Sequence, residues 1–126
     1  HWSYLRHGAP QLNGRFERMN NRRMESKDWA AWISIKTIVE SVLRIQNISN
    51  ENIIEYLKGP DLQVDGSKGI GLNFKKTTNQ LRQTILLISS NNWTTKVAPL
   101  EEFNDSENNL NTLGLSYNQT ECKLEE

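Results

Sequence analysis

The sequence predicts an α/β protein, or an α+β unit if this stretch of 126 residues stands alone, with two to three helices followed by a small sheet of two to three strands. Three observations lead to this prediction. Apolar residues recur with helical period over residues 26–46, apolar and polar residues alternate over 70–74, and a continuous apolar run closes the segment 81–88. Helical patterns therefore come first, and strand patterns follow them.

The longest predicted helix covers residues 26–46. Ser26 is suited to cap its first turn, and Asp28 places a negative charge at the positive end of the helix dipole. Seven apolar side chains share one face, which we expect in the core, while a polar set faces away from it. The apolar face comprises Ala31, Ile35, Ile38, Val39, Val42, Leu43 and Ile45, and the polar face Lys36, Thr37, Glu40, Ser41 and Arg44.

The amino end of this helix departs from the pattern, because residues 29–33 are apolar on every side. We therefore expect protein to cover that end all round. Trp29 and Trp32, separated by two alanines, fit two interpretations: large aromatic residues in a core, or a stacking platform for a ring-shaped ligand.

A first short helix is predicted from Pro10, a good first helical residue, to Asn21. Leu12, Phe16 and Met19 have the spacing of one buried stripe on it.

A third helix is predicted over residues 50–58, capped by Ser49. Its Ile53, Ile54 and Leu57 are expected to face inward.

Strands are predicted after the third helix. A turn at 65–69 precedes a half-exposed strand at 70–74, and we expect a hairpin over 72–88. The run 85–88 is apolar on both faces, so it should lie centrally, with 93–97 as a third strand or an extended edge.

The composition limits the function classes. Fifteen basic and fifteen acidic residues give a formal net charge of zero, which disfavours a non-specific nucleic-acid binder. Only 36% of residues are hydrophobic, so the core is modest and self-association stays open. Residues 1–103 are predicted to form the folded unit, and 104–126 a polar, partly mobile tail with a docking segment at 113–115.

No sequence motif for catalysis, metal binding or cofactor binding is found. We therefore predict a protein that is not an enzyme and that needs no metal and no cofactor. His1 and His7 do not have the spacing of a zinc pair, and Cys122 is the single cysteine.

Arginines cluster between residues 15 and 23. Guanidinium groups can clamp a carboxylate or a phosphate, but a solvated face paired with Glu17 and Glu25 is the favoured interpretation. An enzyme that uses this cluster with Asp28 is the weakest of three functional hypotheses, the other two being a solute-binding component and an interaction domain. The arginines are Arg15, Arg18, Arg22 and Arg23.

The chain resembles the carboxy-terminal part of type 1 periplasmic binding proteins, the receptors of branched-chain amino acid type ABC importers, in the branch associated with pyrroloquinoline-quinone-dependent alcohol oxidation systems. S-K-D-W-A-A-W at 26–32 and Q-L-R-Q at 80–83 are the specific segments of this resemblance. V-D-G-S-K-G at 64–69, A-P-L-E at 98–101 and N-T-L-G-L at 111–115 match the branch in the same order.

The resemblance implies an extracytoplasmic solute-binding component, located in the periplasm, whose two lobes close on a small organic solute and are recognised by the membrane subunits of an ABC transporter. It implies that this chain supplies helices to one lobe and strands near the hinge. The ligand-contacting position of that class falls five residues before Trp29, on Met24, and Arg23 and Ser26 lie beside it. The implied ligand-binding residues are Arg23, Met24, Ser26 and Trp29.

An alternative stays open. The chain can be a stand-alone, non-enzymatic interaction domain that forms a homodimer through the apolar surface that the other lobe would cover.

Overall fold

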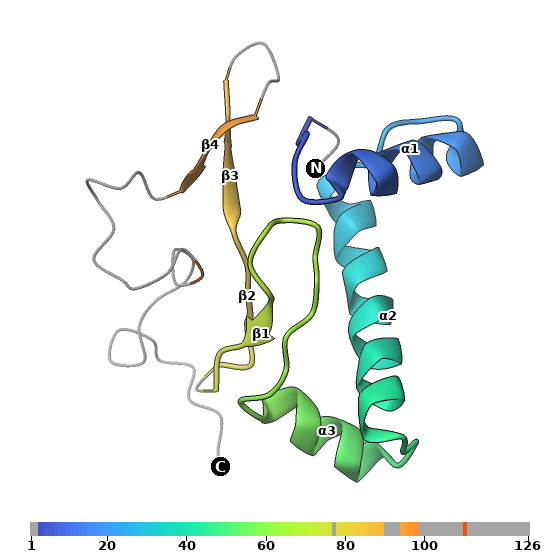
Figure 1. Cartoon of the computed structure of the whole chain (residues 1–126), viewed down its shortest axis with the longest axis vertical. Coiled ribbons are helices and arrows are strands. Elements are labelled where there is room, and N and C mark those ends of the chain that lie inside the picture. Colours follow the sequence, from blue (N-terminus) through green and yellow to red (C-terminus); the bar gives the residue numbers. More distant parts are fainter. Residues whose placement is uncertain (1–2, 77, 90–93, 99–109, 111–126) are drawn as a thin grey trace.

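A computed structural model describes residues 3–76, 78–89, 94–98 and 110 of the chain, and Figure 1 shows their arrangement. Three helices are followed by two small antiparallel strand pairs within this part, which confirms the predicted α+β class. The elements are α1 (Ala9–Asn20), α2 (Ser26–Ile45), α3 (Asn50–Lys58), β1 (Asn73–Phe74), β2 (Leu81–Arg82), β3 (Ile85–Ile88) and β4 (Thr94–Ala98).

The predicted long helix is confirmed as α2, but the prediction of its capping residue is wrong. Glu25 occupies the N-cap position, and Ser26 is the first helical residue. The Asp28 carboxylate accepts a hydrogen bond of 2.9 Å from the Glu25 backbone N–H. A carboxylate at the third helical position reaches back to the backbone of the capping residue, so Glu25 and Asp28 form a capping box at this end of α2.

The predicted core face of α2 is also wrong, because the helix buries the opposite side. Its buried residues are Trp29, Ile33, Thr37 and Ser41. On the predicted core face, Ala31, Ile35, Ile38, Val39 and Leu43 are exposed, and Val42 and Ile45 are partly buried. Ile35 and Leu43 keep 66% and 69% of their accessible surface, so this is a solvent-facing apolar stripe.

The reason lies in the loop between α3 and β1, which runs along α2 (Figure 1). The Trp29 Nε1–H donates to the Gly66 carbonyl at 2.9 Å, and the Lys36 ammonium donates to the Asp65 carbonyl. The hydroxyls of Thr37 and Ser41 donate to backbone carbonyls four residues earlier in α2, both at 2.7 Å. Because these hydroxyls are satisfied within the helix, they can be buried without an outside partner.

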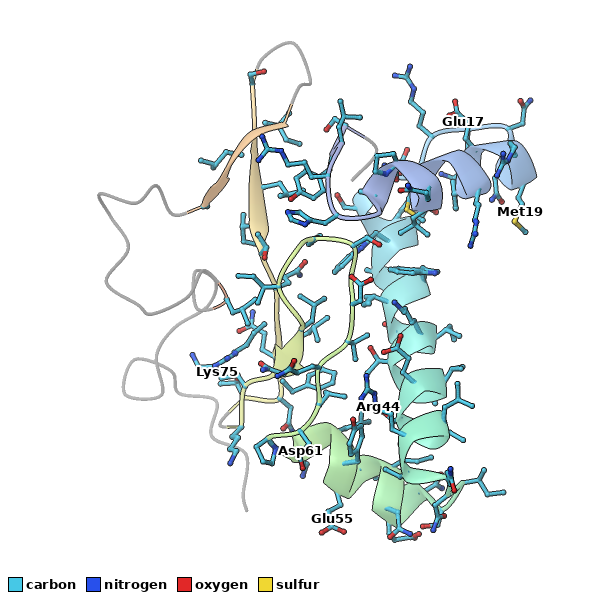
Figure 2. The ribbon with its side chains drawn as sticks, viewed as in Figure 1. Glu17, Met19, Arg44, Glu55, Asp61 and Lys75 are labelled. Carbon is cyan, nitrogen blue, oxygen red and sulfur yellow. The ribbon has the colours of Figure 1, made fainter. Side chains whose placement is uncertain are left out.

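Helix α1 follows its predicted extent closely, but one residue of its stripe is not buried. Leu12 and Phe16 pack against the core, whereas Met19 is 84% exposed. Figure 2 shows Met19 near the end of α1 that projects away from the other elements. The helix therefore reaches beyond the core before its third stripe position.

Helix α3 has the predicted boundaries, and the Ser49 hydroxyl accepts the predicted capping bond from the Asn52 backbone N–H at 3.3 Å. Ile53 is partly buried, but Ile54 is exposed, so its predicted inward orientation is wrong. Tyr56 and Leu57 make the contacts of α3 with the core.

The predicted hairpin over 72–88 is confirmed only in part. β1 pairs with β2 in antiparallel register, but β2 ends at Arg82 and residues 85–88 form the separate strand β3. The predicted third strand is β4, which pairs with β3 and not with the hairpin. The central position predicted for β3 is wrong, because β4 is its one strand partner in the described part and Leu87 and Ile88 are exposed.

The core lies between α2, the loop from α3 to β1, and the β1–β2 hairpin. Its buried members are Met24, Trp29, Ile33, Leu62, Val64, Leu72 and Leu110. Leu110 is the described residue of the predicted tail 104–126, and it is buried. The predicted mobility of that tail, the docking of 113–115, and the positions of His1 and Cys122 lie outside the described residues. None of the described helices combines the length and apolar character that a membrane span requires.

Candidate functional site

A cavity of about 510 Å³ lies at the amino end of α2. Four segments far apart in the sequence form its wall: the stretch before α1, the first turn of α2, the loop along α2, and the chain from β2 into β3. The lining residues are Ser3, Ser26, Lys27, Trp29, Ala30, Lys68, Gln83, Thr84, Ile85, Leu86 and Ile88. Ligand pockets in proteins commonly have volumes of about 300–1,000 Å³, so the cavity has a suitable size for a small molecule.

Lys68 is the most unusual group in this cavity. Its ammonium lies 3.6 Å from the centroid of the Trp29 ring and donates a hydrogen bond of 2.6 Å to the Gln83 side-chain oxygen. Burial lowers the pKa of Lys68 to about 8, because the charged form loses hydration. Both contacts are to neutral groups, so neither of them balances the positive charge of the ammonium.

Thr84 is the second unusual group. It is 1% exposed and lines the cavity, and its Oγ1 has no hydrogen-bond partner within the described residues. A buried hydroxyl without a partner is uncommon and costs free energy. It therefore marks a position where a polar atom of a ligand would be favourable.

The amino end of α2 contributes backbone donors. Ser26 and Lys27 are its first two residues, and the N–H groups of a first helical turn have no acceptor within their own helix. The first bond of the i to i−4 type at this end is Trp29 N–H to the Glu25 carbonyl, at 3.1 Å. The carboxylates of Glu25 and Asp28 form a capping box at the same end, so Ser26 and Lys27 are the first-turn residues that belong to the cavity wall.

Apart from Ser3, the remaining wall is apolar. It is formed by the Trp29 ring and by Ile85, Leu86 and Ile88 of β3. Ile88 is 55% exposed, so the β3 side of the cavity reaches the surface of the chain.

The four predicted ligand-binding residues divide into two pairs. Ser26 and Trp29 line the cavity. Arg23 is exposed and Met24 is buried in the core at 1% exposure, and neither belongs to the lining set. Met24 therefore belongs to the hydrophobic core, which it shares with Trp29, and not to the cavity wall.

The tryptophan pair is used differently from a stacking platform. Trp29 is buried beneath Lys68, and the Lys36 ammonium lies 5.1 Å from the centroid of the Trp32 ring. Each of the two indole rings thus has a lysine ammonium over its face. The expected all-round covering of this end is wrong, because Ala30 and Ala31 are exposed.

The arginine cluster lies apart from the cavity. Arg22 forms a two-pronged ion pair with Asp28, with both N–O distances at 2.6 Å, and its guanidinium lies 4.9 Å from the centroid of the Phe16 ring. This pair joins the end of α1 to the start of α2. Together with the Glu25 N–H, it lowers the pKa of Asp28 to about 2.

Sequence reasoning missed Lys68 and Thr84. Lys68 lies within the segment 65–69, which shows only turn chemistry, and Thr84 directly precedes the apolar run of β3. The available signals were a lysine next to Gly69 and a single hydroxyl bordering four apolar residues. Neither signal shows that the two residues line one cavity at the amino end of α2.

No group of three or more His, Cys, Asp or Glu side chains comes together to hold a metal ion in the part of the chain that the structure describes. Comparison of the chain with protein family models, with curated proteins and with solved structures finds no match in any of the three.

Proposed function

We propose that this chain is part of the extracytoplasmic solute-binding component of an ABC-type importer, and that the cavity at the amino end of α2 binds a small organic solute. The observation that carries the proposal is the cavity itself, about 510 Å³ in volume and lined by Ser26 and Trp29 of the S-K-D-W-A-A-W segment. The resemblance of that segment to type 1 periplasmic binding proteins supports the transport role and the periplasmic location.

In the proposed mechanism, a solute contacts this chain and a second lobe together and stabilises their closed arrangement. Ligands act in this way by binding one conformation more tightly than another. The membrane subunits of the transporter then recognise the closed arrangement. Because one lobe cannot close on itself, we expect solute binding to this chain without compaction in small-angle X-ray scattering.

The experiment is a solute screen on the purified chain, read by calorimetry and by native mass spectrometry. Ala30 and Ala31 offer a matched pair of variants, because both are exposed and adjacent in α2 but only Ala30 lines the cavity. Ala30→Phe should abolish binding by filling the cavity, and Ala31→Phe should leave it intact. Equal binding by the two variants would assign the solute to another site, and an unresponsive wild-type chain would contradict the proposal.

A second candidate function is self-association, and the exposed apolar face of α2 favours it. Ala31, Ile35, Ile38, Val42 and Ile45 are spaced alternately by four and three residues, the spacing of a seam between two packed helices. The stripe contains no charged residue.

The occupant that fits this face is a second copy of the chain. An antiparallel pairing sets Ile35 opposite Ile38 and Ala31 opposite Val42 of the second copy. The formal net charge of zero also means that two copies have no overall repulsion.

Light scattering after gel filtration tests this candidate. The wild-type chain should be a dimer, and Ile35→Glu should be a monomer because it places a charge in the seam. Met19→Glu is the control, since Met19 is 84% exposed but lies on α1. A monomeric wild-type chain would exclude self-association without bearing on solute binding.

A further inference from the structure

The charges around the cavity are unbalanced. Lys27 and Lys68 line it, and none of its lining residues is Asp or Glu. Lys27 has a carboxylate neighbour outside the cavity, Glu25 at 3.1 Å, and its side chain is 79% exposed. Lys68 is mostly buried, and its two contacts are a neutral amide and an aromatic ring. A buried charge is costly unless it is paired, so the cavity favours an anion beside Lys68.

The position of the orphaned hydroxyl agrees with an anion independently. Thr84 follows Gln83, whose side-chain oxygen accepts the Lys68 hydrogen bond, and both residues line the cavity. An oxygen of an anionic group can accept a hydrogen bond from the Thr84 hydroxyl, which has no partner within the described residues. The backbone N–H groups at the start of α2 add further donors to the same wall, since Ser26 and Lys27 belong to it.

The apolar part of the wall limits the rest of the molecule. Ile85, Leu86 and Ile88 line the cavity with no charged group among them, and Ile88 lies at its exposed side. A ligand with a single polar end and an aliphatic or aromatic body matches this division. A single buried ammonium balances one negative charge, which favours a monocarboxylate over a doubly charged phosphate ester.

We infer that the solute is a small apolar monocarboxylate, whose carboxylate binds the Lys68 ammonium and the Thr84 hydroxyl and whose body lies along Ile85, Leu86 and Ile88. This inference rests on the proposed solute-binding function and names its ligand class.

The test compares two probes of nearly the same shape, hexanoate and hexanamide, by calorimetry on the wild-type chain. Hexanoate should bind at least about tenfold more tightly, because a hydrogen bond to a charged group is worth about 1.5–3 kcal/mol and 1.4 kcal/mol is a factor of ten. Equal affinities, or tighter binding of hexanamide, would overturn the inference and leave the proposed function standing. Failure of both probes, together with a negative solute screen, would overturn the two together.

Variants then locate the carboxylate. Lys68→Met should lower hexanoate affinity by about tenfold or more while leaving hexanamide affinity nearly unchanged, and Lys68→Arg should retain the preference for the anion. Thr84→Val should weaken hexanoate binding by a smaller factor. Lys36→Met is the matched control, because Lys36 also lies over a tryptophan ring but outside the cavity. A hexanoate affinity that Lys68→Met does not change would overturn the assignment, with circular dichroism confirming that each variant is folded.

Discussion

The Lys68 ammonium lies 3.6 Å from the centroid of the Trp29 ring, and the indole N–H of the same tryptophan donates to the Gly66 carbonyl two residues before that lysine. One side chain of α2 therefore holds the loop at two points. A cation over an aromatic ring is worth about 2 kcal/mol where water is excluded, and a buried hydrogen bond adds to this. The contact both closes the core and shapes the cavity wall.

Replacing Lys68 should change how stability depends on pH. Burial lowers the pKa of Lys68 to about 8 from its ordinary value of 10.5, so between these pH values the unfolded chain binds more protons than the native chain. The contribution of Lys68 to the free energy of unfolding should therefore rise as the pH increases from about 8 to 10.5. Urea unfolding of Lys68→Met should lack that part of the rise, whereas Lys36→Met should keep it. The same pH profile in both variants would contradict the lowered pKa.

Trp29→Phe should destabilise the chain by about 1–3 kcal/mol beyond the loss of apolar area, because the buried Gly66 carbonyl loses its donor. Trp32→Phe is the control, since Trp32 is only partly buried. Chemical unfolding followed by far-ultraviolet circular dichroism measures both variants without relying on indole fluorescence. Equal destabilisation by the two substitutions would mean that the Gly66 bond has little net effect.

Asp28 should contribute to stability at neutral pH and lose its contribution in acid. The hydrogen bonds from Arg22 and the Glu25 N–H hold its pKa at about 2, below the ordinary value of 3.8. The stabilisation is complete above the ordinary value and disappears as the pH falls through about 2. Asp28→Asn should be less stable at pH 7 and should lose less stability between pH 4 and pH 2 than the wild-type chain. Glu51→Gln, which changes a first-turn carboxylate of α3, should keep the wild-type acid dependence.

Two glycines should respond to alanine in opposite directions. At Gly66, an added Cβ would lie 2.5 Å from Leu72 Cδ1 and 3.1 Å from Trp29 Cζ2, so Gly66→Ala should cost about 1–3 kcal/mol through overpacking. At Gly14, within α1, no atom lies within 4 Å of the added Cβ apart from its chain neighbours and the backbone of its own helix, and Gly14→Ala should gain about 0.5–1 kcal/mol of stability. Thermal unfolding of the two variants gives the comparison, and a stabilised Gly66→Ala would refute the close packing of the loop on α2.

Local chemistry was enough to predict several elements. The Ser49 cap predicted α3 with its observed bounds, and the strand patterns at 70–74 and 81–88 predicted a hairpin, part of which is the β1–β2 pair. These features depend on neighbours within a few residues, which periodicity and capping preferences describe. Of the four predicted ligand-binding residues, Ser26 and Trp29 line the cavity, and both lie in the segment that the family resemblance indicated.

Periodicity and capping preferences were sufficient to locate the helices and to show that α2 has one apolar and one polar face. Which of the two faces is buried depends on the packing of the rest of the chain against α2. The hydroxyls of Thr37 and Ser41 donate hydrogen bonds to carbonyls of their own helix. The polar face can therefore pack against the loop that contains Gly66, while Ile35 faces solvent. The placement of Lys68 and Thr84 in the wall of one cavity was likewise a tertiary result, because contacts between residues far apart in the chain leave no period in the sequence.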